Sequence, residues 1–257
     1  MIKIKKQHEI EKMRAAGLII GLLWKEMEKL VVPGVSTWEL DKFADEFIRS
    51  HDAYPAFKGY TVPNLAPFPG AICASVNSVI VHGIPSKNVI LKEGDIIGVD
   101  VGTRKAGYHG DAAYTFTVGE ISQETQRLLD VTQEALEIAI NTAIVGNRIG
   151  DISYAIGKFV KQNGYFCADD LTGHGIGRDL HEDPMIPNVG RKGTGSLIKE
   201  GMTIAIEPMV NVGTNKVIER GWEYLVKDGS LSAHFEHTIL VTDGKPEILT
   251  KVGRENG

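Results

Sequence analysis

The fold is decided by residues 94–116, GDIIGVDVGTRKAGYHGDAAYTF. Two apolar runs flank the turn-forming residues 104–107, Arg-Lys-Ala-Gly, and this pattern is typical of a β-hairpin. The first predicted strand, residues 95–100, ends on Asp100, and Asp111 follows on the second strand. A hairpin here brings the two carboxylates to one place, and two acids at the ends of apolar strands are candidates for chemistry.

Helices are expected on either side of this hairpin. Apolar residues spaced three and four apart predict amphipathic helices at residues 10–31, 40–48, 122–145 and 151–163. Ser36 and Glu39 form a capping-box pattern before the second helix, and Gly164 is a C-cap for the fourth. Short apolar runs predict strands over residues 71–118 and after residue 164, apart from a Gly- and Pro-rich loop at 183–196.

The two halves of the chain resemble each other. Residues 33–40 align with 145–152, and LKEGDIIGVD at 91–100 aligns with IKEGMTIAIE at 198–207. The second alignment places Glu207 on the position of Asp100. We interpret this as an α+β duplication, with halves at about 10–118 and 122–250 inside one domain spanning 1–257. Chance likeness between helix–turn–strand units is the alternative.

Composition excludes several classes of protein. The 257 residues are 42% hydrophobic and 24% charged, which is typical of a globular chain and excludes disorder. The net charge of −5 argues against binding nucleic acid through a broad basic surface. The longest apolar run, residues 17–24, is short of the roughly 20 residues of a membrane span. Two cysteines, Cys73 and Cys167, and no signal peptide favour the cytoplasm.

Further acids and a histidine occupy similar places in the second half. Glu207 ends a predicted strand, Glu236 precedes the apolar run 237–241, and His174 lies between glycines in GHGIG. Four carboxylates meeting at one centre repel each other strongly unless cations neutralise them. Two divalent ions fit this need, and oxygen ligands with one imidazole suit Mn, Fe or Co. The alternative for each single acid is a solvated surface position.

Several motifs taken together resemble one family. The hairpin sequence resembles the type I methionine aminopeptidases in their short bacterial form, as do four other segments: VHGIP (81–85), GHGIGRDLHEDPMIP (173–187), GMTIAIEPMV (201–210) and SLSAHFEHTILVT (230–242). The likeness extends from about Ile4 to Thr250. It implies the pita-bread fold shared by creatinase and aminopeptidases, in which duplicated halves meet at a pseudo-two-fold axis around a curved antiparallel sheet.

The resemblance also implies roles for individual residues. His82 contacts the scissile amide, His181 stabilises its carbonyl oxygen, and Glu207 moves protons. Two divalent ions, of Co, Mn, Fe, Ni or Zn, are implied, with Asp111 and Glu236 bridging them. The implied metal ligands are Asp100, Asp111, His174, Glu207 and Glu236. The remaining histidines, which have no assigned role, are His8, His51, His109, His234 and His237.

The implied reaction is removal of the N-terminal methionine from nascent proteins when the second residue is small. Metal-activated water attacks the first peptide bond. Two alternatives stay open: a proline-specific or creatinase-like hydrolase of the same fold, and a non-catalytic pita-bread module that binds proteins or RNA. The first usually carries a further N-terminal domain, and the second usually lacks metal ligands.

The implied methionine pocket departs from the family in two places. Cys73, Phe68, Trp222 and Met209 fall on pocket positions, with ordinary packing as the alternative for the last two. Leu180 stands where the family usually has Phe. Segment 58–71 is longer and richer in Pro than usual, so the aromatic residue that lines the pocket there stays open.

Two minor features complete the expectations. Asn77, Val79 and Ser232 match a monovalent-cation site of the family, with core polar bonding as the alternative. Lys3, Lys5 and Lys6 form a short basic arm that is either solvated or in transient contact with the ribosome. The expected partners are N-termini of nascent polypeptides. No exposed apolar helix or heptad stands out, which favours a monomer.

Overall fold

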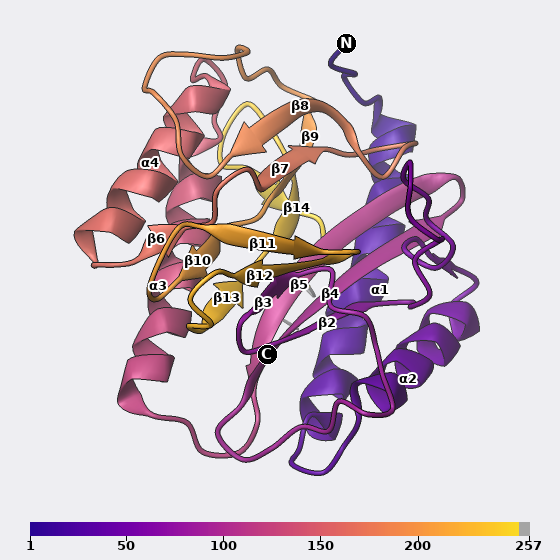
Figure 1. Cartoon of the computed structure of the whole chain (residues 1–257). Helices are drawn as coiled ribbons and strands as arrows, with labels where there is room; N and C mark the ends of the chain where they lie inside the picture. The colour runs from indigo at the N-terminus through magenta and orange to yellow at the C-terminus, as the bar shows by residue number, and fades with distance from the viewer. Residues whose placement is uncertain (252–257) are drawn as a thin grey trace, which may run out of the picture.

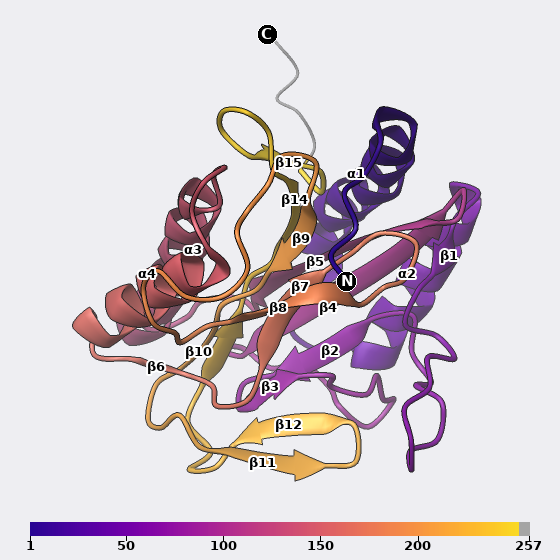
Figure 2. The same ribbon diagram turned by 90° about the horizontal axis from the view of Figure 1, so that it is seen from above.

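The computed structural model describes residues 1–251. Two pairs of helices flank a central body of antiparallel sheets, one pair from each half of the sequence (Figures 1 and 2). The pairs are α1 (Gln7–Leu30) with α2 (Thr37–Ser50), and α3 (Gln123–Thr142) with α4 (Ile149–Gln162). All four predicted helices are confirmed. The predicted capping box is also present, since Ser36 and Glu39 bond to each other's backbone N–H.

The first half builds one four-stranded sheet around a long hairpin. In this sheet β1 (Tyr54–Pro55), β4 (Ile96–Lys105) and β2 (Cys73–Val76) lie in that order, and β5 (Tyr108–Thr117) pairs with β4. The hairpin turn is Ala106-Gly107, and both residues have positive φ, as a two-residue type I′ turn requires. The predicted strand end at Asp100 was wrong. β4 continues to Lys105 because it pairs with β5 along its whole length.

The second half builds shorter strands. Its main sheet has the order β15-β14-β9-β7-β8, and every pairing in it is antiparallel. Its strands are β7 (Thr172–Gly175), β8 (Glu182–Pro187), β9 (Thr203–Ile206), β14 (His237–Leu240) and β15 (Glu247–Ile248). The predicted loop at 183–196 was wrong in its first part, because residues 182–187 pair with β7 as β8. The rest of that segment has no helix or strand.

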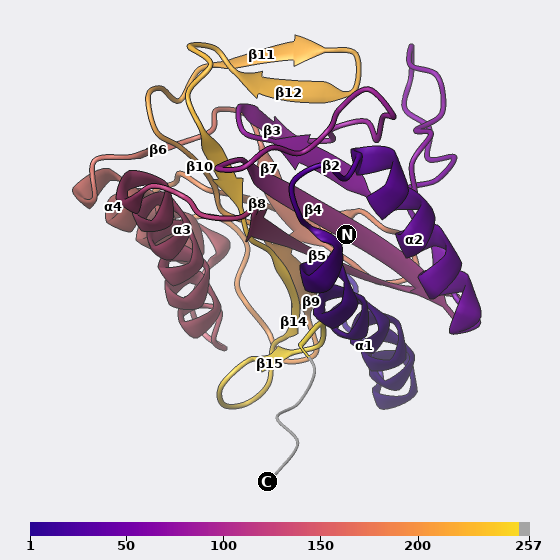
Figure 3. The same cartoon turned by 90° about the horizontal axis from the view of Figure 1, so that it is seen from below.

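Two small sheets complete the fold, and one of them joins the halves. One contains β13 (Ser232–His234), β10 (Met209–Asn211) and β6 (Phe166–Cys167). The other contains β11 (Val217–Arg220), β12 (Glu223–Val226) and β3 (Val79–Val81), so a hairpin of the second half pairs with a strand of the first. Figure 3 shows this β11–β12 hairpin beside β3, apart from both helix pairs.

Local structure repeats between the halves at the positions that the sequence alignment pairs. Gly34 and Gly146 have φ of 95° and 94° at the loops that precede α2 and α4. Antiparallel bridges join Ser36 to Ile90 and Arg148 to Leu197. The loop before each second helix therefore pairs with the segment before the main strand of its own half, which supports the duplication.

Apolar side chains fill the space between each helix pair and its sheet. One cluster packs under α1 and α2, and another under α3 and α4; Tyr114 on β5 contacts both. Cys73 and Cys167 are buried free thiols. Within residues 1–251, no helix is long and apolar enough to cross a membrane.

Candidate metal centre and active site

The first two acids project from one face of the long hairpin. In the β4–β5 register Asp100 pairs with Ala113, and Asp111 pairs with Gly102. Residues two apart on a strand share a face, as do directly paired residues, so both carboxylates lie on the same side as diagonal neighbours. Cys73 on β2 pairs with Asp100 and lies on that face too. The hairpin thus brings the two carboxylates together, as the sequence predicted.

The other two acids lie where β9 and β14 stop pairing. Ile206 pairs with His237, so Glu207 follows the last pair on β9 and Glu236 precedes it on β14. Pro208 has no N–H to continue the ladder. The Glu236 N–H donates to the Ala113 carbonyl at 2.9 Å, which fastens this acid to β5 of the first half. The four acids therefore converge at the seam between the halves.

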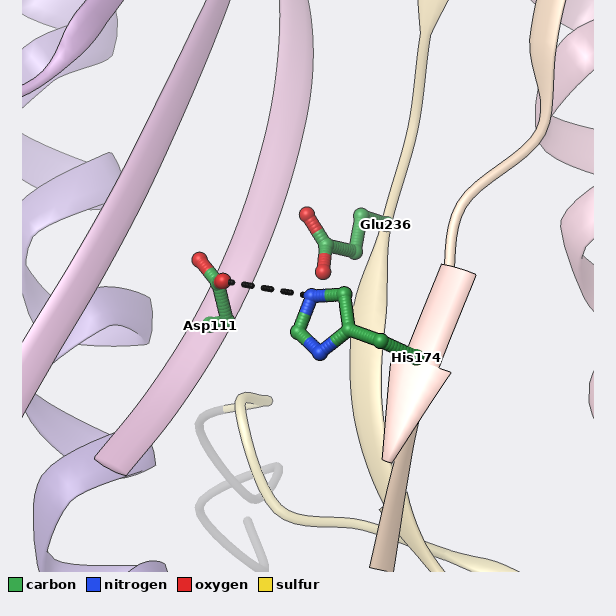
Figure 4. A group of neighbouring side chains, drawn as sticks. All are labelled: Asp111, His174 and Glu236. Carbon is green, nitrogen blue, oxygen red and sulfur yellow. Dashed lines mark ion pairs between the residues drawn. The ribbon is translucent and has the colours of Figure 1, made fainter. Parts of the chain in front are cut away.

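His174 on β7 completes the cluster and is oriented by its backbone. Its Nδ1 lies 2.9 Å from the Gly175 carbonyl, which accepts a hydrogen bond only if Nδ1 carries the proton. Nε2 then has a free lone pair and lies 3.7 Å from Asp111 Oδ2 and 3.8 Å from Glu207 Oε1. Figure 4 shows the side chains of Asp111 on β5, His174 on β7 and Glu236, just before β14, turned toward one another.

The electrostatics of this cluster are those of a cation site. Burial raises the pKa of Glu207 to about 8, and it lowers the pKa of His174 to about 3. Burial, and then the neighbouring carboxylates, hold the pKa of Asp111 and of Glu236 well above the usual range. Burial, and then the Glu207 carboxylate, also hold the pKa of Asp100 well above the usual range.

The polar atoms of the cluster also lack partners. Within residues 1–251, Asp100 Oδ1, Asp111 Oδ1 and Glu236 Oε1 are buried without a hydrogen bond. Ligand atoms of Asp111, His174 and Glu236 all lie within 4.8 Å of one another. Buried acceptors with no donor are costly unless a cation neutralises them. Oxygen ligands with an imidazole are a suitable set for divalent transition metals, so the residues present fit such ions.

Two further histidines border the cluster. His82 follows β3 with a φ of 58°, and burial lowers its pKa to about 4. His181 lies on the exposed loop before β8, with its ring centroid 4.4 Å from that of His174. Its Nδ1 is 2.8 Å from the Tyr60 hydroxyl. Both predicted histidines therefore stand beside the acid cluster.

A cavity opens over the acids and histidines. It is lined by Phe57, Tyr60, Val62, Phe68, Cys73, His82, Asp100, Asp111, His174, Leu180, His181, Glu207, Trp222 and Glu236. Phe68, Cys73, Leu180 and Trp222 thus lie where the sequence placed them. The buried side chain of Met209 packs in an apolar cluster with Ile80, Val81, Ala168 and Val226, and its place in the pocket stays a prediction.

Segment 58–71 forms one wall of this cavity. The Trp222 Nε1–H donates to the Ala66 carbonyl at 2.8 Å, and the Trp222 ring meets Phe68 edge-on at 5.4 Å. Tyr60 reaches His181 from the same segment. The sequence left the lining aromatic residue open, and the structure brings both Tyr60 and Phe68 to the cavity.

The sequence analysis gave no role to His234. Its side chain is 3% exposed, and its Nε2 lies 3.3 Å from Glu207 Oε2. A signal was present: His234 and Glu236 are two residues apart, which is the spacing of residues on one face of a strand. The contact between His234 and Glu207 joins residues far apart in the sequence, and the sequence alone does not show that the fold brings them together.

The remaining predicted positions are mostly occupied by internal contacts. The Asn77 side chain donates to Asp95 at 2.8 Å, and the Asn77 carbonyl accepts the Ser232 N–H at 2.9 Å. The Ser232 hydroxyl is buried, and within the described part of the chain it has no hydrogen-bond partner. The predicted core bonding is therefore present for Asn77, while the Ser232 hydroxyl remains available for a ligand.

Two of the three N-terminal lysines form ion pairs, while Lys6 is exposed. Lys5 is buried and pairs with Glu182 at 2.6 Å. Lys3 pairs with Asp179 at 3.0 Å. Both partners flank His181, so these lysines fasten the N-terminal segment to the His181 loop.

Comparison with known proteins agrees with this site. The sequence matches the metallopeptidase family M24 over residues 11–243. It is 48% identical to a methionine aminopeptidase of Clostridium acetobutylicum over 252 residues, which cover 97% of this chain and 99% of the relative. The crystal structure of a methionine aminopeptidase from Thermotoga maritima superposes with a TM-score of 0.95 at 46% identity and covers 98% of this chain and 100% of that one.

A more distant structure shares the fold. A prolidase from Pyrococcus furiosus superposes with a TM-score of 0.77 at 23% identity, and the match covers 98% of this chain but 66% of the prolidase. The expected pita-bread fold is therefore confirmed. The high identity to methionine aminopeptidases over the full length disfavours the creatinase-like and non-catalytic alternatives.

Proposed function

The chain belongs to the methionine aminopeptidases of metallopeptidase family M24, and from this premise we propose how its residues carry out the reaction. The enzyme is a metallo-hydrolase that removes the N-terminal methionine of polypeptides. The observation that carries the proposal is the buried cluster of four acids and one imidazole, in which Asp100, Asp111 and Glu236 each have one oxygen without a donor within the described residues.

Five residues hold two divalent ions in this proposal. The residues that would hold the ions are Asp100, Asp111, His174, Glu207 and Glu236. Co, Mn, Fe, Ni and Zn are all compatible with this set of donors. When bound, such ions lower the pKa of water from about 15.7 toward about 7 and polarise a carbonyl oxygen.

The protein residues position the substrate and move the proton. His181, oriented by the Tyr60 hydroxyl at 2.8 Å, donates from Nε2 to the scissile carbonyl oxygen. His82 contacts the amide on the opposite side of the peptide. Glu207 transfers a proton to the leaving amine, because its buried carboxylate lines the cavity beside His174 and the other acids.

The cavity accounts for specificity at both ends of the scissile bond. The methionine side chain lies against Phe68, Cys73 and Trp222, where a thioether finds aromatic and thiol contacts. The side chain of the second residue is bracketed by His82 and His181. A bulky side chain there displaces the carbonyl, and a misplacement near 1 Å costs about 100-fold in rate. Only small second residues are therefore accepted.

A peptide panel tests this assignment. We expect Met-Ala-Ser and Met-Gly-Ser to be cut about 100-fold faster, in kcat/KM, than Met-Lys-Ser or Met-Leu-Ser. Peptides that begin Ala-Pro should not be cut. Norleucine and leucine at the first position report whether Leu180 widens the pocket. Equal rates for Met-Ala-Ser and Met-Lys-Ser would contradict the proposed walls.

We also propose finer assignments. The unpartnered Ser232 hydroxyl favours a monovalent cation at Asn77, Val79 and Ser232. Nascent polypeptides are the proposed substrates, and a cytoplasmic monomer is the proposed form. Ribosome contact through Lys3 or Lys5 is not proposed, because both side chains are engaged in ion pairs.

A further inference from the structure

His234 is held rigidly beside the acid cluster. It ends β13, where it pairs with Met209 of β10. The Thr115 hydroxyl donates a hydrogen bond to the His234 carbonyl at 2.7 Å, and the His234 N–H donates to the Thr115 hydroxyl oxygen at 3.0 Å. These contacts fix the backbone of β13 against β5, so the position of the imidazole is set by the fold.

The imidazole faces two of the proposed metal ligands. Nε2 lies 3.3 Å from Glu207 Oε2 and 3.9 Å from Glu236 Oε2. The three ligand atoms lie within 4.8 Å of one another. His174 approaches the other oxygen of Glu207, Oε1, at 3.8 Å. Glu207 is therefore placed between two imidazoles.

A hydrogen bond does not account for this position. Among the described residues, His234 Nε2 makes none, although it is completely buried. A buried ring nitrogen without a partner is unfavourable, because it has lost its hydrogen bonds to water. Metal–ligand bonds of about 2.1 Å place neighbouring ligand atoms about 3–4 Å apart, which is the separation found here.

We propose that His234 is a sixth ligand of the metal centre and supplies Nε2 to the ion that Glu207 and Glu236 hold. This inference rests on the proposed dinuclear site and adds a second imidazole to it. The centre would then be held by two imidazoles, those of His174 and His234. Imidazole favours Fe, Co, Ni and Zn over Mn, whose preferred ligands are oxygens.

Proton NMR of the cobalt-substituted protein tests the proposal directly. A histidine bound to Co²⁺ through Nε2 shifts its own Nδ1–H far outside the normal spectral range, so each ligated histidine gives one exchangeable signal. We expect two such signals from the wild-type protein and one from His234→Gln. Calorimetric titration with Co²⁺ should show at least a 10-fold loss of affinity at one of the two sites.

A matched control uses another buried histidine that faces away. His237 is the next residue after Glu236, so its side chain projects from the opposite face, where it contacts Thr250 and Trp24. His237→Gln should keep both shifted signals and both affinities.

Two results would overturn the inference, and they differ. One persistent signal in both the wild-type protein and His234→Gln, with unchanged affinities, would remove His234 and leave the five-ligand centre intact. No shifted signal and no Co²⁺ binding in the wild-type protein would remove the proposed centre itself. If His234→Gln does not fold, the wild-type spectrum decides, because ligation by His234 requires two signals.

Discussion

The two halves of the molecule deliver their acids in different ways. In the first half, Asp100 and Asp111 lie inside two ten-residue strands that pair along their whole length. In the second half, Glu207 and Glu236 lie just beyond four-residue strands, where pairing has stopped. The first half places short side chains on a rigid ladder, whereas the second places longer side chains at strand ends.

This difference shows which parts of a duplicated fold can vary. The helix pairs, the glycine-containing loops before α2 and α4, and the two isolated bridges repeat closely. The histidines of the centre come mainly from the second half, as His174, His181 and His234. The substrate walls come from unrepeated segments, namely residues 58–71 and the β11–β12 hairpin. The common framework positions the proposed metal ligands, and the unique segments line the cavity above them.

Both halves contribute acids to the proposed metal centre, so removal of the metal should have the largest effect on activity. Chelation should abolish activity reversibly while the helices persist, because the apolar clusters do not depend on the ions. In metal-free protein the raised pKa of Glu207, about 8, means that folding favours its protonated form. Stability should therefore fall as pH rises from 6.5 to 8, a window in which histidines with lowered pKa stay neutral.

The measurement is the melting temperature of loaded and metal-free protein across that pH window. The difference in melting temperature between loaded and metal-free protein should increase with pH, because protons compete with metal for the carboxylates. A difference that stays constant, or full activity without metal, would contradict the converging acid cluster.

Substitution of equivalent acids compares the halves directly. Asp100→Asn and Glu207→Gln change aligned positions with little change in shape. We expect about a 10³-fold loss of kcat or more for Glu207→Gln, because it removes both a ligand charge and the proton transfer. Asp100→Asn should weaken metal binding and regain part of its activity at high metal concentration.

Glu219→Gln is the matched control, since Glu219 is an exposed glutamate of the second half on β11. It should leave kcat/KM unchanged. Equal rescue of Asp100→Asn and Glu207→Gln by added metal would show that Glu207 acts only as a ligand.

Local sequence patterns predicted the helices and the converging acids, but they did not predict every residue that lies beside those acids. Periodicity and the capping box identified α1 to α4, because these signals are contained within one helix. The end of β4 was predicted wrongly, since Asp100 looks like a terminus until β5 is known to pair beyond it. The positions of Met209 and His234 depend on contacts between distant strands, which one sequence does not encode locally.

The β11–β12 hairpin of the second half pairs with β3 of the first half. Substitution of Trp222, which lies in this hairpin, tests its part in substrate binding. Trp222→Ala removes an aromatic wall and the hydrogen bond to Ala66, so we expect about a tenfold loss in kcat/KM for Met-Ala-Ser, mainly through KM. Trp222→Phe keeps a ring and should recover most of the loss. An unchanged KM in Trp222→Ala would show that the methionine side chain lies elsewhere.

The smallest expected effect concerns the contact between Tyr60 of the first half and His181 of the second. The Tyr60 hydroxyl lies 2.8 Å from His181 Nδ1, and a donated hydrogen bond there leaves the proton of the neutral ring on Nε2, facing the cavity. Tyr60→Phe removes that bond and keeps the ring. A net hydrogen bond of about 1 kcal/mol corresponds to about a fivefold loss, which should appear in kcat because His181 acts on the developing oxyanion. Tyr54→Phe, at an exposed tyrosine on β1, is the control. The same loss in a His181→Ala background would show that Tyr60 acts independently of His181, and the two halves would then contribute to substrate binding separately.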